Sequence, residues 1–167
     1  MSVEVEPLRT LTVFTGLTDG QLERVAGVLK RHAIPAGMEI VTEGEKSTSL
    51  FVLARGSVGT SKRLGLAVRG PMDATKQKLL VYISAPQFFG EMGLLTDHER
   101  SATITAQTEC EVLELRRADF DRLAQEDLAF GYVVVRNIAV VLADRLRNTD
   151  HDVLKLTAAL SLSLGNR

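Results

Sequence analysis

Two residues that can bind an anion lie side by side near the middle of the chain. Arg100 and Ser101 directly precede the alternating apolar run 102–106. An arginine offers a planar fork of N–H donors to a phosphate, and a serine hydroxyl adds one more donor. This pair therefore predicts a phosphate-binding loop.

The preceding residues, from Phe88 onward, add a glycine, a carboxylate and two amides. Gly90 allows the backbone to approach a ligand closely, and the N–H groups of Met92 and Gly93, at the start of a short helix, are expected to point at negative charge. Glu91 would repel a phosphate, so its natural partner is a sugar hydroxyl, as in dinucleotide sites. A nucleoside whose phosphate is tied back to its ribose presents both groups in one compact ligand.

The pattern Gly-Glu-x-Gly-Leu-Leu, followed by Arg-Ser-Ala, resembles the phosphate-binding cassette of cyclic-nucleotide-binding domains, which occurs in catabolite activators and kinase regulatory subunits. The resemblance assigns the ribose 2′-hydroxyl to Glu91 and the cyclic phosphate to Arg100, Ser101 and the backbone of residues 92–93. The step from Glu91 to Arg100 has the kinase-subunit length and is one residue shorter than in the catabolite activator. The implied ligand is cAMP or cGMP, with no cofactor.

Composition indicates one compact module. The chain has 167 residues, 45% of them apolar, which suits a single domain with a proper core. A net charge of -1 offers nucleic acid no general attraction. The N-terminus lacks the apolar region of a secretory signal, and no stretch approaches the ~20 apolar residues of a membrane span, so we expect a cytoplasmic protein without membrane contact. Cys110 is the single cysteine and lies in an alternating run, which predicts a buried structural thiol.

The pattern of apolar residues and glycines predicts a mainly β fold with flanking helices. Residues 7–30 are expected to be helical, with a capping box at Thr18–Gln21. Short apolar runs punctuated by glycine over 32–116 predict a small β-barrel or roll that contains the cassette, 88–106. Helices are expected over 117–164. The spacing from Gly37 to Gly56 also resembles the jelly roll (double-stranded β-helix) of the same family.

Two segments of the predicted roll depart from that family. Residues 47–49, Ser-Thr-Ser, replace the aspartate often found in this turn, a change that we expect to affect turn geometry and to leave ligand binding alone. Residues 64–78 form a long basic excursion between two strands. This excursion is interpreted either as a solvated surface loop or as a docking surface for an acidic partner.

The C-terminal region carries a second pattern, in which apolar residues recur at steps of four and three from Leu128 to Leu160. Such a/d spacing over five heptads predicts an amphipathic helix long enough for a two-stranded coiled coil. The part from Leu128 to Val135 is expected to pack on the chain's own roll. Beyond Leu142 the seam is expected to project past the domain, which favours a homodimer.

The resemblance extends to the ligand's base. Thr149 matches the threonine with which the catabolite activator's dimer helix contacts adenine, whereas Asp150 replaces the serine that reaches over from the other subunit. Thr149 is therefore a candidate ligand-binding residue that favours cAMP. The alternative is a hydroxyl that bonds to its own helix carbonyl.

No residue pattern indicates catalysis. The three histidines, His32, His98 and His151, lack ligand spacing, so no metal site is predicted, and Ser101 has no assigned base. The sequence is thus interpreted as a regulatory module and not an enzyme. The chain also shows no helix-turn-helix after the long helix, so it is expected not to bind DNA alone and to be either a free-standing sensor or a domain of a larger regulator. The competing interpretation is a ligand-free interaction module of the same fold.

Overall fold

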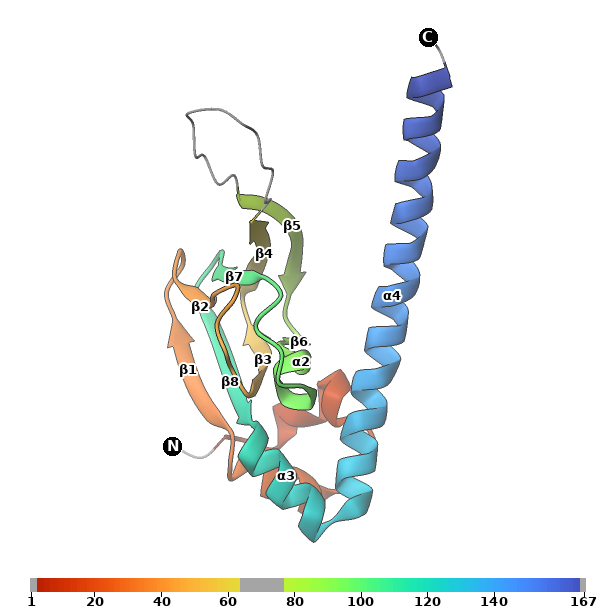
Figure 1. Ribbon diagram of the computed structural model, residues 1–167. Coiled ribbons are helices and arrows are strands. Elements are labelled where there is room, and N and C mark those ends of the chain that lie inside the picture. The colour runs from red at the N-terminus through yellow and green to blue at the C-terminus, as the bar shows by residue number, and fades with distance from the viewer. Residues whose placement is uncertain (1–2, 64–76, 166–167) are drawn as a thin grey trace.

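The computed structural model describes residues 3–63 and 77–165, in which two antiparallel sheets of four strands form a roll flanked by helices (Figure 1). The strand orders are β1-β8-β3-β6 and β2-β7-β4-β5. The strands are β1 (Lys30–Ile34), β2 (Glu39–Val41), β3 (Ser49–Arg55), β4 (Ser57–Arg63), β5 (Gln77–Ser84), β6 (Gln87–Phe89), β7 (Thr103–Ala106) and β8 (Cys110–Arg116). The predicted mainly β roll is confirmed.

Both faces of the central strands β3 and β8 are covered, whereas the edge strand β1 has no buried residue. Leu53 and Val112 lie inside the roll, whereas Leu50 and Leu113 face the helices, and all four side chains are at most 2% exposed. Strands buried on both faces read as continuous apolar runs, which accounts for the run at 50–53. Cys110 lies in the inner cluster and is buried, as its alternating neighbours predict.

The N-terminal segment forms two 3-10 turns, Glu6–Thr10 and Thr12–Phe14, and then α1 (Asp19–Ala26). The predicted capping box is present, because Gln21 N–H donates to the Thr18 hydroxyl and the Gln21 side chain accepts from Thr18 N–H. The helical prediction for 7–30 is too long. Lys30 already belongs to β1, which pairs with β8, and such long-range pairing is not visible in local periodicity.

Two helices complete the chain, α3 (Arg117–Glu126) and the 38-residue α4 (Leu128–Gly165). The start of α4 packs on the helical core through Phe130, Val134 and Ile138, each at most 2% exposed. Further along, α4 extends as a single rod beside the roll (Figure 1). Within the described residues, no helix is both long and apolar enough to cross a membrane.

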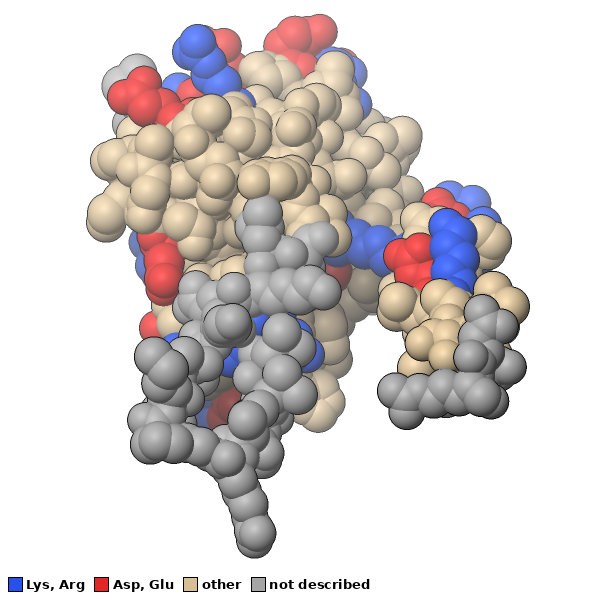
Figure 2. Space-filling model, turned by 90° about the horizontal axis from the view of Figure 1, so that it is seen from above, with Lys and Arg blue, Asp and Glu red and all other residues tan. Residues whose placement is uncertain are grey.

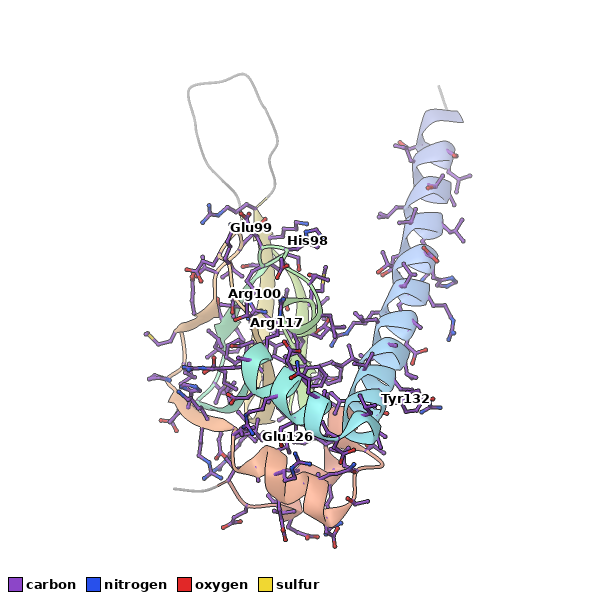
Figure 3. All side chains as sticks on the ribbon, turned by 60° about the horizontal axis from the view of Figure 1, so that its bottom comes forward. His98, Glu99, Arg100, Arg117, Glu126 and Tyr132 are labelled. Carbon is purple, nitrogen blue, oxygen red and sulfur yellow. The ribbon has the colours of Figure 1, made fainter. Side chains whose placement is uncertain are left out.

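The prediction that α4 packs from Leu128 to Val135 holds for the segment, which packs through Phe130 and Val134, but is wrong for its a/d residues. Leu128 and Tyr132, expected to pack on the roll, are 80% and 68% exposed, and Tyr132 points away from the roll in Figure 3. The core-facing stripe and the a/d stripe lie on different sides of the helix, because the two sets of positions are offset by about two residues. The exposed part of the a/d stripe thus begins at Leu128, is interrupted by Leu142, which packs against the core, and resumes with Leu146, Val153, Leu156 and Leu160, all at least 55% exposed.

The basic excursion falls outside the described residues up to position 76. Its flanking strands, β4 and β5, pair with each other from Arg63↔Gln77 to Ser57↔Ser84. The last two residues of the predicted excursion, 77–78, belong to β5.

Candidate functional site

The predicted cassette folds as a tight turn and one short helix, α2 (Glu91–Leu95), between β6 and β7. Gly90 precedes α2 with φ +75°, a backbone conformation that favours glycine. A Cβ atom at Gly90 or Gly93 would lie 2.5 or 2.7 Å from Nη1 of Arg100. The two glycines therefore make room for the guanidinium, which links the two halves of the sequence motif.

The Arg100 side chain is directed into the protein and is only 7% exposed. Nη1 donates to the Gly90 carbonyl at 3.0 Å, Nη2 donates to the Ser49 carbonyl at 2.8 Å and to the Ser47 hydroxyl, and the group lies 5.5 Å from the centre of the Phe51 ring. Three of its five N–H groups are thereby used. Nε is buried and has no hydrogen-bond partner among the described residues.

The guanidinium also lacks a carboxylate in direct contact within residues 3–63 and 77–165. Burial lowers the pKa of Arg100, and the more distant charges of Glu91, Glu114 and Glu45 act in the opposite direction. A buried cation without an ion-pair partner is costly. An anion bound at this position would remove that cost.

The turn before β3 is part of the site. We expected the Ser-Thr-Ser segment at 47–49 to leave ligand binding alone, but the Ser47 hydroxyl and the Ser49 carbonyl both accept from Arg100. The serine side chain is shorter than that of aspartate, and its hydroxyl is uncharged. It therefore accepts a hydrogen bond from the guanidinium without neutralising the positive charge. The replacement of an aspartate at this turn therefore bears directly on the anion site.

Glu91 is 6% exposed and contacts α4. Its Oε1 accepts from Nη1 of Arg145 at 2.6 Å, and Nη2 of Arg145 donates to the Phe88 carbonyl at 3.0 Å. The other oxygen, Oε2, is buried and unpaired in the described part of the chain. A buried carboxylate oxygen without a donor suits a ligand hydroxyl.

The other predicted phosphate contacts, Ser101 and the backbone of residues 92–93, lie in different environments. Ser101 follows Arg100 in the chain and is exposed. Met92 is 42% exposed at the outer face of α2. The Gly93 amide, however, donates to the Gly90 carbonyl at 3.0 Å. The prediction that this amide is available to the phosphate is wrong for this structure, because the tight turn uses the N–H itself.

Thr149 lies apart from the cassette, in a cavity between α4 and the β4–β5 hairpin. The cavity has a volume of about 560 Å³, and the hollow between the end of α4 and the roll is visible in Figure 2. Its lining also includes Tyr82, Arg145, Asn148 and Asp152. Because Arg145 lines the cavity and bonds to Glu91, it joins the two parts of the predicted site.

The Thr149 hydroxyl donates to the Arg145 carbonyl at 2.9 Å, which is the alternative considered from the sequence. Its single proton is thus committed, while its oxygen lone pairs can still accept.

Arg145 was missed by sequence reasoning. It lies four residues before Thr149, one helical turn away on the same face, and this spacing was a usable signal. Its partner, Glu91, is 54 residues away in sequence.

The fold and these residues define a β-roll module with a buried cation, a partly unpaired carboxylate and a cavity against a long helix. The sequence model of the "Cyclic nucleotide-binding domain" family matches residues 31–127, more than half of the chain. The chain belongs to the cyclic nucleotide-binding domain family.

Similar proteins agree with this assignment. The chain is 32% identical over 126 residues to the cAMP-activated global transcriptional regulator CRP of Haemophilus influenzae, covering 75% of this chain and 51% of the relative. It is 30% identical over 136 residues to the cAMP-activated global transcriptional regulator Vfr of Pseudomonas aeruginosa, covering 79% and 58%. The chain thus spans little more than half the length of these relatives.

Solved structures match as well. The Thermus thermophilus catabolite activator protein superposes with a TM-score of 0.71 and 28% identity, covering 87% of this chain and 63% of that one. A cyclic nucleotide-binding domain from Methylobacillus flagellatus has a TM-score of 0.76 at 19% identity, over 90% and 80% of the two chains, and supports the fold alone.

Proposed function

We propose that this chain is a regulatory module that binds a cyclic nucleotide, cAMP in preference to cGMP, and signals through α3 and α4 without catalysing a reaction. The cyclic phosphate lies at Arg100 and Ser101, the ribose 2′-hydroxyl at Glu91, and the base in the cavity beside Thr149. Membership of the family and relatives named as cAMP-activated regulators support this proposal.

The observation that carries the proposal is a pair of buried polar atoms on the two charged residues of the cassette. A third buried atom without a partner in the described residues, Nε of Arg117, belongs to the neighbouring arginine of α3. Nε of Arg100 is a donor and Oε2 of Glu91 is an acceptor, and neither is satisfied by the described residues. Buried polar atoms without partners are uncommon and call for an explanation. A cyclic nucleotide supplies an acceptor for the first and a hydroxyl donor for the second.

The proposed preference for cAMP rests on the hydrogen bond that the Thr149 hydroxyl donates within its own helix. Because this hydroxyl donates to the Arg145 carbonyl, it offers the ligand only its lone pairs. Adenine carries an amino group at C6, whereas guanine carries a carbonyl oxygen there. An acceptor therefore favours adenine at this position.

Signalling is proposed to run through the long helix of a cytoplasmic homodimer. Glu91 contacts Arg145 of α4, so the ribose site and this helix share one ion pair. The exposed a/d stripe of α4 suits the same stripe of a second copy. A ligand that favours one arrangement of the helix pair would shift the population of the dimer's states.

Calorimetry tests the proposal with cAMP, cGMP and 5′-AMP. We expect binding of cAMP, weaker binding of cGMP, and little heat with 5′-AMP, whose phosphate is not tied to the ribose. Absence of heat with both cyclic nucleotides would favour the ligand-free interaction module. One observation supports that alternative, because hydrogen bonds within the protein already use part of the capacity of both charged groups. Arg100 donates to Ser47 and Ser49, and Glu91 accepts from Arg145.

A further inference from the structure

A second arginine, Arg117, also holds the cassette. It is the first residue of α3, and its side chain is 21% exposed. Nη2 donates to the Gly93 carbonyl at 2.7 Å and to the Thr96 carbonyl, and Nη1 pairs with Asp97. These acceptors lie within α2 and just beyond its C-terminal end, where a cation is also favoured by the helix dipole.

The two arginines share their neighbours. Gly93 has its Cα against the Arg100 guanidinium and its carbonyl bonded to Arg117. At the start of β3, the Ser49 carbonyl accepts from Arg100, and the carbonyl of the preceding residue, Thr48, accepts from the Arg117 backbone N–H at 2.7 Å. Both labelled side chains lie around α2 in Figure 3. A movement of Arg100 toward a ligand would therefore displace atoms that Arg117 holds.

Arg117 also belongs to the helical side of the molecule. From this residue α3 runs to Glu126, and the Phe120 ring of α3 lies 6.0 Å from the Phe130 ring of α4, centre to centre. Phe120 and Phe130 are at most 6% exposed, so this contact belongs to the buried core. A displacement at the start of α3 is thus transmitted to the root of α4 through close packing.

We infer that Arg117 is a positioning residue that couples the nucleotide-binding cassette to the α3–α4 helices. It holds α2 through backbone carbonyls and touches neither the phosphate nor the ribose. The inference rests on the proposed function, because the signal that Arg117 transmits is the binding of a cyclic nucleotide. It adds a second connection to α4, at the helix root, beside the Glu91–Arg145 pair further along.

The test compares Arg117→Gln with Arg122→Gln by amide hydrogen exchange, with and without saturating cAMP. Arg122 is on the same helix, is 52% exposed, and pairs only with Asp119 and Glu126 of that helix among the described residues. In wild type and in the Arg122 variant, we expect cAMP to increase protection in both the cassette and α3. In Arg117→Gln, protection should still increase in the cassette but no longer in α3, and affinity should fall about tenfold.

A second variant and a ligand-free measurement complete the test. Arg117→Lys keeps the charge but not the fork, so it should restore part of the α3 response. Without nucleotide, Arg117→Gln should already raise exchange in α2 relative to Arg122→Gln. Equal α3 responses in the two glutamine variants, or unchanged exchange in ligand-free α2, would overturn the role of Arg117. A wild type that binds neither cyclic nucleotide would instead overturn the proposed function, and the ligand-free comparison would still decide whether Arg117 holds α2.

Discussion

At the scale of single residues, the site depends on how two buried charges are satisfied. Arg100 and Glu91 each use part of their hydrogen-bonding capacity on the protein and keep one buried atom without a partner in the described structure. This division holds each group in place and still leaves it capacity for a ligand. The consequences can be measured one residue at a time.

Arg100→Ala should remove the principal contact with the phosphate and weaken cAMP binding by about 3 kcal/mol, roughly a hundredfold. Titration calorimetry measures the loss, and Arg122→Ala, an exposed arginine on α3 that pairs with Asp119 and Glu126 of its own helix, serves as the control. Wild-type affinity in Arg100→Ala, with the β fold intact by circular dichroism, would remove the cassette from the site.

Glu91→Gln should weaken binding less than Arg100→Ala, because an amide oxygen can still accept from the ribose 2′-hydroxyl. The variant also leaves Arg145 without its carboxylate. A 2′-deoxy analogue should bind wild type weakly and show little further loss on the variant. Losses that simply add would mean that Glu91 does not contact this hydroxyl.

Thr149→Val keeps the shape of the side chain and removes its hydroxyl. We expect cyclic-phosphate binding to persist and the ratio of cAMP to cGMP affinity to fall by about tenfold, the value of one hydrogen bond of about 1.4 kcal/mol. Helix stability should be unchanged or slightly improved, since back-bonding hydroxyls do not favour helices. An unaltered ratio would show that Thr149 does not contact the base.

At the scale of elements, three strands meet at Glu114 of β8. Its carboxylate accepts from the Ser49 hydroxyl of β3 at 2.7 Å and lies 3.0 Å from Nε2 of His32 on β1. Burial acts to raise the pKa of Glu114, but the hydrogen bonds from Ser49 and His32 and the charge of Arg116 outweigh it, so the pKa is lowered. Because Ser49 also accepts from Arg100, this network adjoins the anion site.

A lowered carboxyl pKa makes the folded state sensitive to acid. The stabilisation from Glu114 is fully present above its unfolded-state pKa and is lost as pH falls through the lower, folded-state pKa. Glu114→Gln should therefore reduce the free energy of unfolding by about 1 kcal/mol at pH 7, and the difference from wild type should shrink below about pH 4. Urea denaturation across this range measures both. Glu111→Gln, on the same strand, is the control, and a difference that stays constant with pH would contradict the prediction.

At the scale of the whole molecule, α4 presents an apolar stripe with no partner in the described chain. Leu146 and Leu156 are 63% and 70% exposed on the a/d face, whereas Leu154, 67% exposed, lies off that face. The periodicity predicts the stripe over residues 128–160, and the structure exposes it at both ends, with Leu142 between them packed against the core. Such length favours a paired helix.

The double substitution of Leu146 and Leu156 by Asp should convert a dimer into a monomer, because charge buried in the seam has no partner. Multi-angle light scattering measures the mass, and circular dichroism should show an intact β fold. Leu154→Asp, equally exposed but off the seam, should leave the dimer intact. A wild type that is monomeric at high concentration would refute the pairing.

The sequence alone determined the features that depend on neighbours along the chain. The capping box at Thr18, the alternating strands, the cassette from Gly90 to Ser101 and the long helix all follow from local backbone preferences and short spacings. A motif of this kind keeps its residue types close together whatever the rest of the chain does, so Gly90, Glu91 and Arg100 are identifiable from residue type and spacing.

Only the tertiary structure decided which distant groups meet. The Glu91–Arg145 pair and the Arg100 bonds to Ser47 and Ser49 join residues more than 50 positions apart, as the path of the chain brings them together. It also decided that the Gly93 amide is used within its own turn and that the seam from Leu128 is exposed. Periodicity specifies that a helix has an apolar face, but which face is buried depends on the surface it packs against.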